Sequence, residues 1–149
     1  MDQKSMQDHI KEKRKEKWFE ALFVIEALAI EKDIVEKSMK AHVEKMEKLR
    51  DVLVYETNYL DVIKVEKPMK DIEEAYSQVV KVRFFAKNLV ILLSMVMAYG
   101  PSSVEILGPD KHEIKAEEAQ NVSNLLAGVV HQFAAAGLGG MIITPDKQG

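Results

Sequence analysis

The sequence contains no cysteine in its 149 residues, and only 7% of them are aromatic. The absence of cysteine excludes disulfide bonds, thiol nucleophiles and thiolate metal sites. Together with the abundance of Glu and Lys, it favours a reducing cytoplasm and is compatible with a thermophilic source. Residues 1–17 contain no apolar run, so we expect no secretory signal and predict a cytoplasmic protein.

An excess of charge of one sign is also missing. Charged residues form 30% of the chain, and the net charge is −3. Nucleic-acid-binding domains usually carry a clear basic excess, so the composition gives no global attraction to nucleic acid, although a local basic face is still compatible with it. The most apolar run, residues 89–99, has about half the ~20 residues that cross a bilayer, so we predict no membrane segment.

Residues 68–99 carry the clearest pattern in the chain. Pro68 suits a first helical position, acidic residues follow it, and Gly100 and Pro101 end the pattern. Apolar residues recur at helical spacing in between, and Ser94 is the one polar residue of the last three turns. A helix that is apolar all round must be covered on every side. We therefore predict a central buried helix around which the other elements pack.

The N-terminal part, residues 10–53, also shows helical spacing and predicts one long helix or a helix pair. Its second half has the narrow apolar stripe of a coiled-coil strand. This stripe gives the candidate residues of a self-association seam, which are Val35, Met39, His42, Met46, Leu49 and Leu53.

The remaining segments predict a small β appendage and a further helix. Residues 54–66 alternate as one or two short strands, and residues 103–115 read as a β-hairpin around a Pro-Asp turn. A third helix is predicted over 116–136 and a short strand over 141–144. The predicted fold is one domain, 1–149, mostly α with a small antiparallel β appendage (α+β): a helical bundle around the central helix.

Catalytic patterns are absent from the sequence. The glycines from Gly137 to Gly140 follow a predicted helix and precede a strand, the reverse of a phosphate-binding loop. Ser102 and Ser103 lack the setting of a nucleophile elbow. No histidine lies three or four residues from another, as a helical zinc pair requires. We therefore predict no metal, no cofactor and no enzyme activity.

Two basic features admit two interpretations each. A run of five cations interleaved with Glu12 and Glu16 is either a solvated helix face or a phosphate contact. Arg83 falls on an apolar seam, where it either pairs with an acid of the chain or receives a phosphate or a partner's carboxylate. The candidate nucleic-acid contacts are Lys11, Lys13, Arg14, Lys15, Lys17, Lys81, Arg83 and Lys87.

The predicted order of elements, with helices over 18–53, 68–99 and 116–136 and a hairpin over 104–115, resembles the small helical subunit of archaeal CRISPR effector complexes of the Cascade type. The resemblance lies in the architecture, and no motif transfers functional residues. It implies a filament of copies along a guide-RNA complex in antiviral defence, where basic side chains hold the target or displaced strand without chemistry.

Three functional hypotheses follow. The first is a non-catalytic structural or binding subunit of a larger complex, such as that CRISPR effector, in contact with a nucleic-acid backbone. The second is a homo-oligomeric helical scaffold or protein-interaction module with no role in nucleic-acid binding. The third is a small ligand-binding domain or enzyme with a pocket near residues 100–103 and 137–140. The expected partners are other protein subunits or further copies of the chain.

Overall fold

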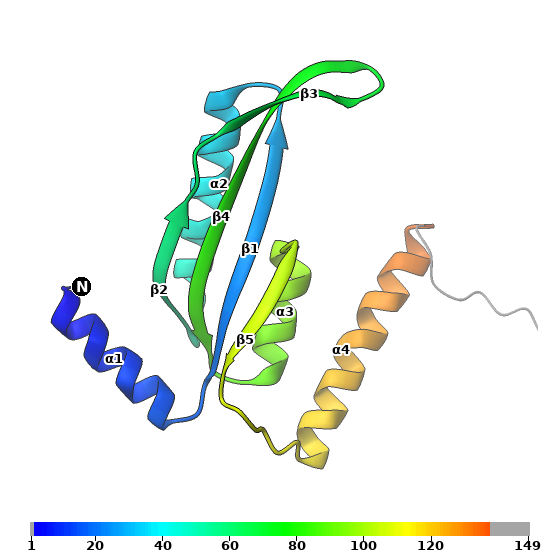
Figure 1. The fold of residues 1–149 in the computed structure, drawn as a ribbon. Coiled ribbons are helices and arrows are strands. Elements are labelled where there is room, and N and C mark those ends of the chain that lie inside the picture. Colours follow the sequence, from blue (N-terminus) through cyan, green and yellow to red (C-terminus); the bar gives the residue numbers. More distant parts are fainter. Residues whose placement is uncertain (1, 138–149) are drawn as a thin grey trace, which may run out of the picture. The chain divides into compact units, whose positions relative to one another are not determined.

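The computed structural model of the chain describes residues 2–137. The chain divides into two compact units between His112 and Glu113. Three helices and five strands belong to the first unit, and one helix of the described residues belongs to the second (Figure 1).

An antiparallel sheet forms the frame of the first unit. Its central strands are β1 (Phe19–Ala29) and β4 (Ile72–Ala86). β2 (Val52–Tyr59) and β3 (Ile63–Met69) pair in succession with the free edge of β4, and β5 (Ser103–Gly108) pairs with the other edge of β1. The strand order is therefore β2-β4-β1-β5, with β3 as an extension beside β4.

Two helices cover one face of this sheet. α2 (Lys32–Glu47) connects β1 to β2, and α3 (Leu89–Tyr99) connects β4 to β5. Figure 1 shows both helices on the same side, behind the sheet in that view. Apart from β3, the chain order is strand, helix, strand, strand, helix, strand. With the observed strand order, this is the βαββαβ arrangement of the ferredoxin-like fold.

The main core lies between this inner face of the sheet and the two helices. Phe23 and Phe84 are fully buried at its centre, and their rings meet edge to face with centroids 4.6 Å apart. Aromatic pairs prefer such offset or edge-on geometry. The neighbouring buried side chains come from β1, β4, α2 and α3. They are Ile25, Val80, Val82, Met39, Val43, Met46, Leu92 and Met95.

The transition from β4 to α3 has a local cause. Asn88 caps the helix, because its side-chain oxygen accepts a hydrogen bond from the backbone N–H of Ile91 at 2.9 Å. At the other end, Gly100 adopts φ 52°, a left-handed conformation that glycine takes at low cost. The two signals confine the helix to the apolar segment between them.

α1 (Gln3–Lys15) precedes the sheet. Asp2 caps it by accepting a hydrogen bond from the N–H of Ser5 at 2.7 Å. Ile10 is its one buried residue, at 5% exposure. The last turn of α1 is basic. Two residues after the helix ends, Lys17 adopts a φ of 61°, and the chain reverses there toward β1.

In the second unit, α4 (Ala116–Ala135) begins with Glu117 and Glu118 in its first turn, where carboxylates complement the helix dipole. Leu126, Val130 and Phe133 of this helix are exposed. Within residues 2–137, no helix combines the length and the apolar character that crossing a bilayer requires.

The predicted helical bundle with a small β appendage is wrong, because a sheet forms the centre of the first unit. Residues 10–53, predicted as one helix or a helix pair, contain α1, β1 and α2. In β1 the side chains of Ala21, Phe23 and Ile25 alternate inward, while Glu20 points outward. This two-residue period coexists with apolar residues at helical spacing, and the helical spacing misled the prediction.

The predicted central helix over 68–99 is correct only in its last third. Residues 72–86 form β4, in which Val80, Val82 and Phe84 face the core and Lys81 and Arg83 face away. β-branched and aromatic residues favour a strand here. Residues 89–99 do form α3, yet the helix is covered on one side only, with Leu92 and Met95 as its buried residues.

The smaller elements follow the predictions in part. The predicted strand region 54–66 corresponds to β2 and β3, and the predicted helix 116–136 corresponds to α4. The hairpin over 103–115 is wrong, because β5 pairs with β1 and residues 109–115 form no strand. The strand predicted over 141–144 lies outside the described residues.

Truncating Phe84 tests the position of the core. Phe84→Ala removes a fully buried ring and should lower the free energy of unfolding by about 3–5 kcal/mol in urea denaturation. Ile63 is 65% exposed, so Ile63→Ala should change it by less than about 0.5 kcal/mol. Equal effects of the two substitutions would contradict this description of the core.

Candidate functional site: the outer sheet face

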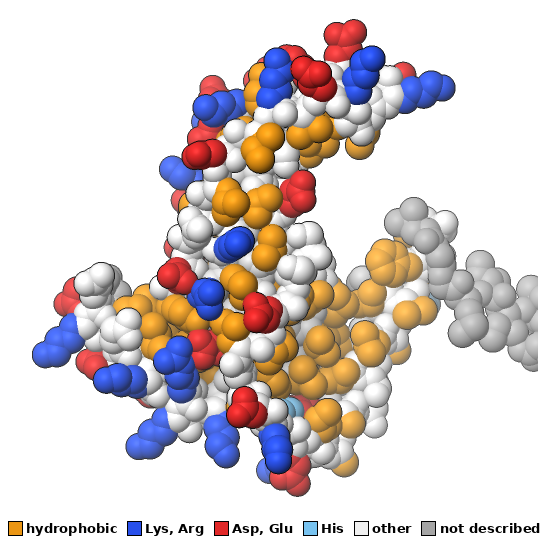
Figure 2. Space-filling model, in the orientation of Figure 1, with side chains coloured by type: hydrophobic (Ala, Val, Ile, Leu, Met, Phe, Trp, Pro, Cys, Tyr) orange, Lys and Arg blue, Asp and Glu red, His pale blue; other side chains and the backbone are white. Residues whose placement is uncertain are grey.

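The face of the sheet opposite α2 and α3, here called the outer sheet face, carries the candidate site. The register places Leu22 opposite Arg83, and Val24 opposite Lys81, on this face. Further along the strands, Glu26 lies opposite Val79. Figure 2 views this side and shows apolar side chains along the middle of the sheet, with cations and acids among and around them. The face therefore mixes aliphatic and charged side chains, since Lys81 and Arg83 of the central strand β4 lie opposite Val24 and Leu22. Its residues are Leu22, Val24, Glu26, Leu28, Ser77, Val79, Lys81, Arg83 and Glu105.

A network of hydrogen bonds joins α1 to one end of this face. Nε and Nη2 of Arg14 donate to the two carboxylate oxygens of Glu20 at 2.9 and 3.0 Å. The hydroxyl of Tyr55 donates to Glu20 Oε2 at 2.6 Å. Glu20 is only 8% exposed, and these three bonds satisfy its buried charge. The network fixes the C-terminal turn of α1 against β1 and β2.

A β-bulge in β2 makes this network possible. Val54 lies opposite Phe84 and Glu56 lies opposite Arg83, so Tyr55 is an extra residue in β2 with no partner of its own in β4. Tyr55 and Glu56 consequently both reach groups of the outer sheet face. The hydroxyl of Tyr55 binds Glu20 of β1. The carboxylate of Glu56 forms an ion pair with Arg83, with 2.9 Å between Oε2 and Nε.

The ionisation of these groups disfavours acid–base catalysis. The hydrogen bond from Arg14 lowers the pKa of Glu20, although burial opposes this effect, so the carboxylate is a poor base near neutral pH. Burial and the bond to Glu20 raise the pKa of Tyr55 to about 12, so its phenol is a poor acid. A general acid or base needs a pKa near the working pH. This pair is suited to holding structure.

Arg83 was predicted either to pair with an acid of the chain or to receive a phosphate or a partner's carboxylate. In the structure it pairs with an acid of the chain and stays accessible to solvent. Its side chain is 41% exposed while it contacts Glu56. Lys81, two residues earlier on the same face, is exposed and makes no ion pair within residues 2–137. The outer sheet face carries Lys81, Arg83, Glu26 and Glu105, and the adjoining Arg14, Glu20 and Glu56 bring the sum to three cations against four acids. The face is thus not a basic patch.

The other predicted nucleic-acid contacts lie away from the centre of this face. Lys13 contacts Glu16 at 3.7 Å and stands 4.1 Å from the ring centroid of Trp18, a cation–π geometry. Lys11 and Lys15 are exposed on α1, Lys17 follows it, and Lys87 is exposed after β4. Figure 2 shows the cations that gather over α1. Of the predicted set, the structure therefore places only Arg14, Lys81 and Arg83 on or beside the outer sheet face.

The predicted self-association seam is the inner side of the first unit. Val35, Met39 and Met46 are at most 1% exposed and pack toward the sheet. His42 is half-buried, and its Nε2 lies 3.1 Å from the carbonyl oxygen of Tyr99. Leu49 packs on the core, and Leu53 belongs to β2. Val35, Met39 and Met46 are thus packed within the chain and are not available as a free coiled-coil seam.

The pocket predicted near residues 100–103 and 137–140 stays a prediction, because part of it lies outside the described residues. Ser102 is used structurally, because its N–H and hydroxyl both donate to the carbonyl of Val24, at 2.8 and 3.0 Å. Ser103 begins β5, Gly137 follows α4, and residues 138–140 lie outside the described residues. Within residues 2–137, no group of three His, Asp or Glu side chains is placed to hold a metal ion.

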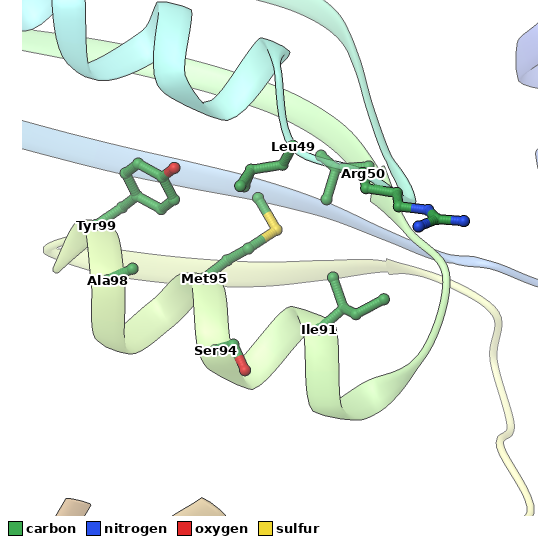
Figure 3. A pocket seen from close by; sticks show the side chains of 8 residues that line it. Leu49, Arg50, Ile91, Ser94, Met95, Ala98 and Tyr99 are labelled. Atoms are coloured by element: carbon green, nitrogen blue, oxygen red, sulfur yellow. The ribbon is translucent and has the colours of Figure 1, made fainter.

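A cavity that the sequence analysis missed lies on the inner side, between α3 and the loop after α2 (Figure 3). Its volume is about 260 Å³, and its walls are mainly apolar. Ser94 and Ala98, one turn apart on α3, are small residues between larger ones. That spacing is the sequence signal that could have indicated a hollow.

Replacing Tyr55 by Phe tests the network. Because folding lowers the pKa of Glu20, the bonds to its carboxylate stabilise the fold above its ordinary pKa of 4.5 and are lost as the pH falls through the lower folded value. Tyr55→Phe should therefore cost about 1.5 kcal/mol of unfolding free energy at pH 7, and progressively less in acid. Urea denaturation from pH 7 to pH 2 measures both values.

Tyr59→Phe is the matched control, because the hydroxyl of Tyr59 makes no hydrogen bond within the described residues. It should change stability by less than about 0.5 kcal/mol at every pH. A Tyr55→Phe cost that is the same at pH 7 and pH 2 would show that Glu20 is not the acceptor that matters.

Comparison with known proteins identifies the family of the chain. The model of the MJ0538 family matches residues 20–145, so the chain belongs to that family. No curated protein matches the sequence. The family description names no CRISPR component. Two of the predicted helices on which that resemblance rested in fact contain long strands, β1 and β4. The resemblance stays a prediction and adds no weight to the functional argument.

Proposed function

We propose that this member of the MJ0538 family is a non-catalytic assembly protein that joins a second copy of itself through the outer sheet face. The observation that supports this function is the arrangement of that face. Leu22, Val24 and Val79 are half-buried aliphatic residues of its two central strands, and Lys81 and Arg83 stand beside them. Residence in the reducing cytoplasm, as the lack of cysteine suggests, is part of the proposal.

The arginines at this face already have acidic partners, so a second molecule could cover them without leaving an unpaired charge. Stable interfaces combine a core depleted in charge with a polar rim. Burying a charge without a partner is costly, and each arginine here already has one: Arg14 pairs with Glu20, and Arg83 pairs with Glu56. A partner that covers these groups would leave no guanidinium uncompensated.

Charge complementarity favours a second copy as that partner. Lys81 and Glu26 have opposite charges and stand at diagonal positions, since Lys81 faces Val24 across the strands and Glu26 faces Val79. A two-fold axis that exchanges these positions sets each Lys81 against Glu26 of the other copy, so one patch complements itself. Nucleic acid is a weaker candidate, because three cations meet four acids here and a phosphate backbone requires an excess of cations.

A charge introduced at the centre of the face tests the dimer. The wild type should sediment as a dimer at micromolar concentration, and Val24→Glu as a monomer, because two buried carboxylates would oppose each other across the interface. Met69→Glu places the same charge at a residue of β3 that is 61% exposed and should leave the dimer intact. A wild type that is monomeric at 100-fold higher concentration than the assay overturns the proposal.

Exchanging charges tests the orientation of the two copies. Lys81→Glu and Glu26→Lys should each weaken the dimer about 5-fold or more at low salt, and the double variant should restore it. A double variant that stays as weak as the single ones contradicts the Lys81–Glu26 pairing. Binding of single-stranded RNA by a monomeric wild type, lost in Lys81→Glu, would replace this proposal with the nucleic-acid function.

A further inference from the structure

The cavity on the inner side of the first unit is lined by one face of α3. Ile91, Ser94, Met95, Ala98 and Tyr99 follow the spacing of a single helical face. Leu49 and Arg50, from the loop after α2, and Val52, from the start of β2, complete the wall. The cavity is hollow because Ser94 and Ala98 are small, while the larger side chains around them hold α3 and the loop apart.

The shape and lining of this space suit an unbranched apolar chain. The floor is Met95, which is 2% exposed, and the Ser94 hydroxyl already donates to the carbonyl of Val90 at 2.7 Å. Ligand sites of drug size usually exceed about 300 Å³. At roughly 30 Å³ for each water-sized group, the 260 Å³ of this cavity hold about eight to nine of them.

A single cation stands at the rim. Arg50 is exposed and makes no ion pair with the residues that the structure describes. Figure 3 shows its side chain at the opposite end of the cavity from Tyr99, with the guanidinium directed away from the other labelled side chains. The next residue, Asp51, has φ 62°, and its carbonyl accepts a hydrogen bond from the N–H of Lys87 at 3.0 Å. The loop that carries Arg50 is thus held in place.

We propose that this cavity binds an unbranched aliphatic carboxylate of about eight carbons. The chain lies along Met95 and Ala98 toward Tyr99, and the carboxylate remains at the rim, where Arg50 pairs with it. A guanidinium recognises a carboxylate with two parallel hydrogen bonds, which gives the site its preference for this headgroup. The site is separate from the proposed dimer interface, because the cavity lies on the other side of the sheet.

Titration with three probes of equal chain length tests the headgroup. Octanoate, 1-octanol and octylamine are added separately at pH 7, and the methyl NMR signals of Ile91 and Met95 are followed. Octanoate should bind at least 10-fold more tightly than octanol, and octylamine should bind most weakly because Arg50 repels it. Equal dissociation constants for octanoate and octanol, or no saturation by octanoate at millimolar concentration, overturn the proposal.

Three substitutions test the residues. Ala98→Leu fills the cavity and should weaken octanoate binding 10-fold or more. Arg50→Gln should lower octanoate affinity to that of octanol. Lys48→Gln, which removes another exposed cation at the end of α2, should leave it unchanged. Should Ala98→Leu fail to fold, Arg50→Gln decides the question, because Arg50 is exposed and its replacement disturbs no core.

Two further outcomes distinguish binding in the cavity from binding on the outer sheet face and from contact between copies. Octanoate-induced shifts at Leu22 and Val24 with none at Ile91 and Met95 would place binding on the outer sheet face and overturn the cavity site. Shifts of Ile91 and Met95 that appear on dilution without ligand would assign the cavity to a second copy of the chain, which also overturns it. A normal octanoate response in the Val24→Glu variant supports the site whether or not the dimer exists.

Discussion

The pairing of β1 with β4 is the constraint on which the rest of the first unit depends. The two strands are antiparallel over eleven consecutive residue pairs, from Phe19 with Ala86 to Ala29 with Tyr76. Side chains of a strand alternate between faces, so this one register decides which residues form the core with α2 and α3 and which form the outer sheet face. Phe23 and Phe84 fix the register from the inner side, because a shift of either strand by one residue would turn the buried ring of that strand away from the core.

The same register places the charged side chains of β1 and β4 beside the groups that compensate them. Glu20 is buried beside β2 and requires Arg14 and Tyr55, which attach α1 to the sheet. Arg83 projects from the same face and is compensated by Glu56. The pairs hold the surroundings of an aliphatic surface in a neutral state. Such an arrangement suits the proposed dimer interface, in which charges that become buried need partners.

The sequence predicted the elements whose signals are local and missed those that depend on partners. α4 and the end of α3 at Gly100 were predicted because glycines and helical spacing mark them, whereas the start of α3 after Asn88 was placed too early, at Pro68. β1 and β4 were missed because long apolar strands buried on one face and half-covered on the other also contain residues at helical spacing. The alternation of Val80, Lys81, Val82 and Arg83 was the available evidence for a strand. The partner of Arg83 could not be predicted, since Glu56 reaches it through the pairing of β2 with β4. Glu20 lies only six residues from Arg14, but the turn that brings them together falls inside the segment predicted as helical over residues 10–53.

The bulge in β2 separates the attachment of the N-terminal helix from the architecture of the sheet. Regular pairing continues on both sides of Tyr55, with Val54 opposite Phe84 and Glu56 opposite Arg83. A chain without this single residue would keep every other side chain of β2 on its present face. It would lose only the phenol that reaches Glu20. Arg14 attaches α1 to Glu20 directly, and the inserted Tyr55 reinforces this attachment. A protein of this architecture can therefore gain or lose the reinforcement without any change of strand register.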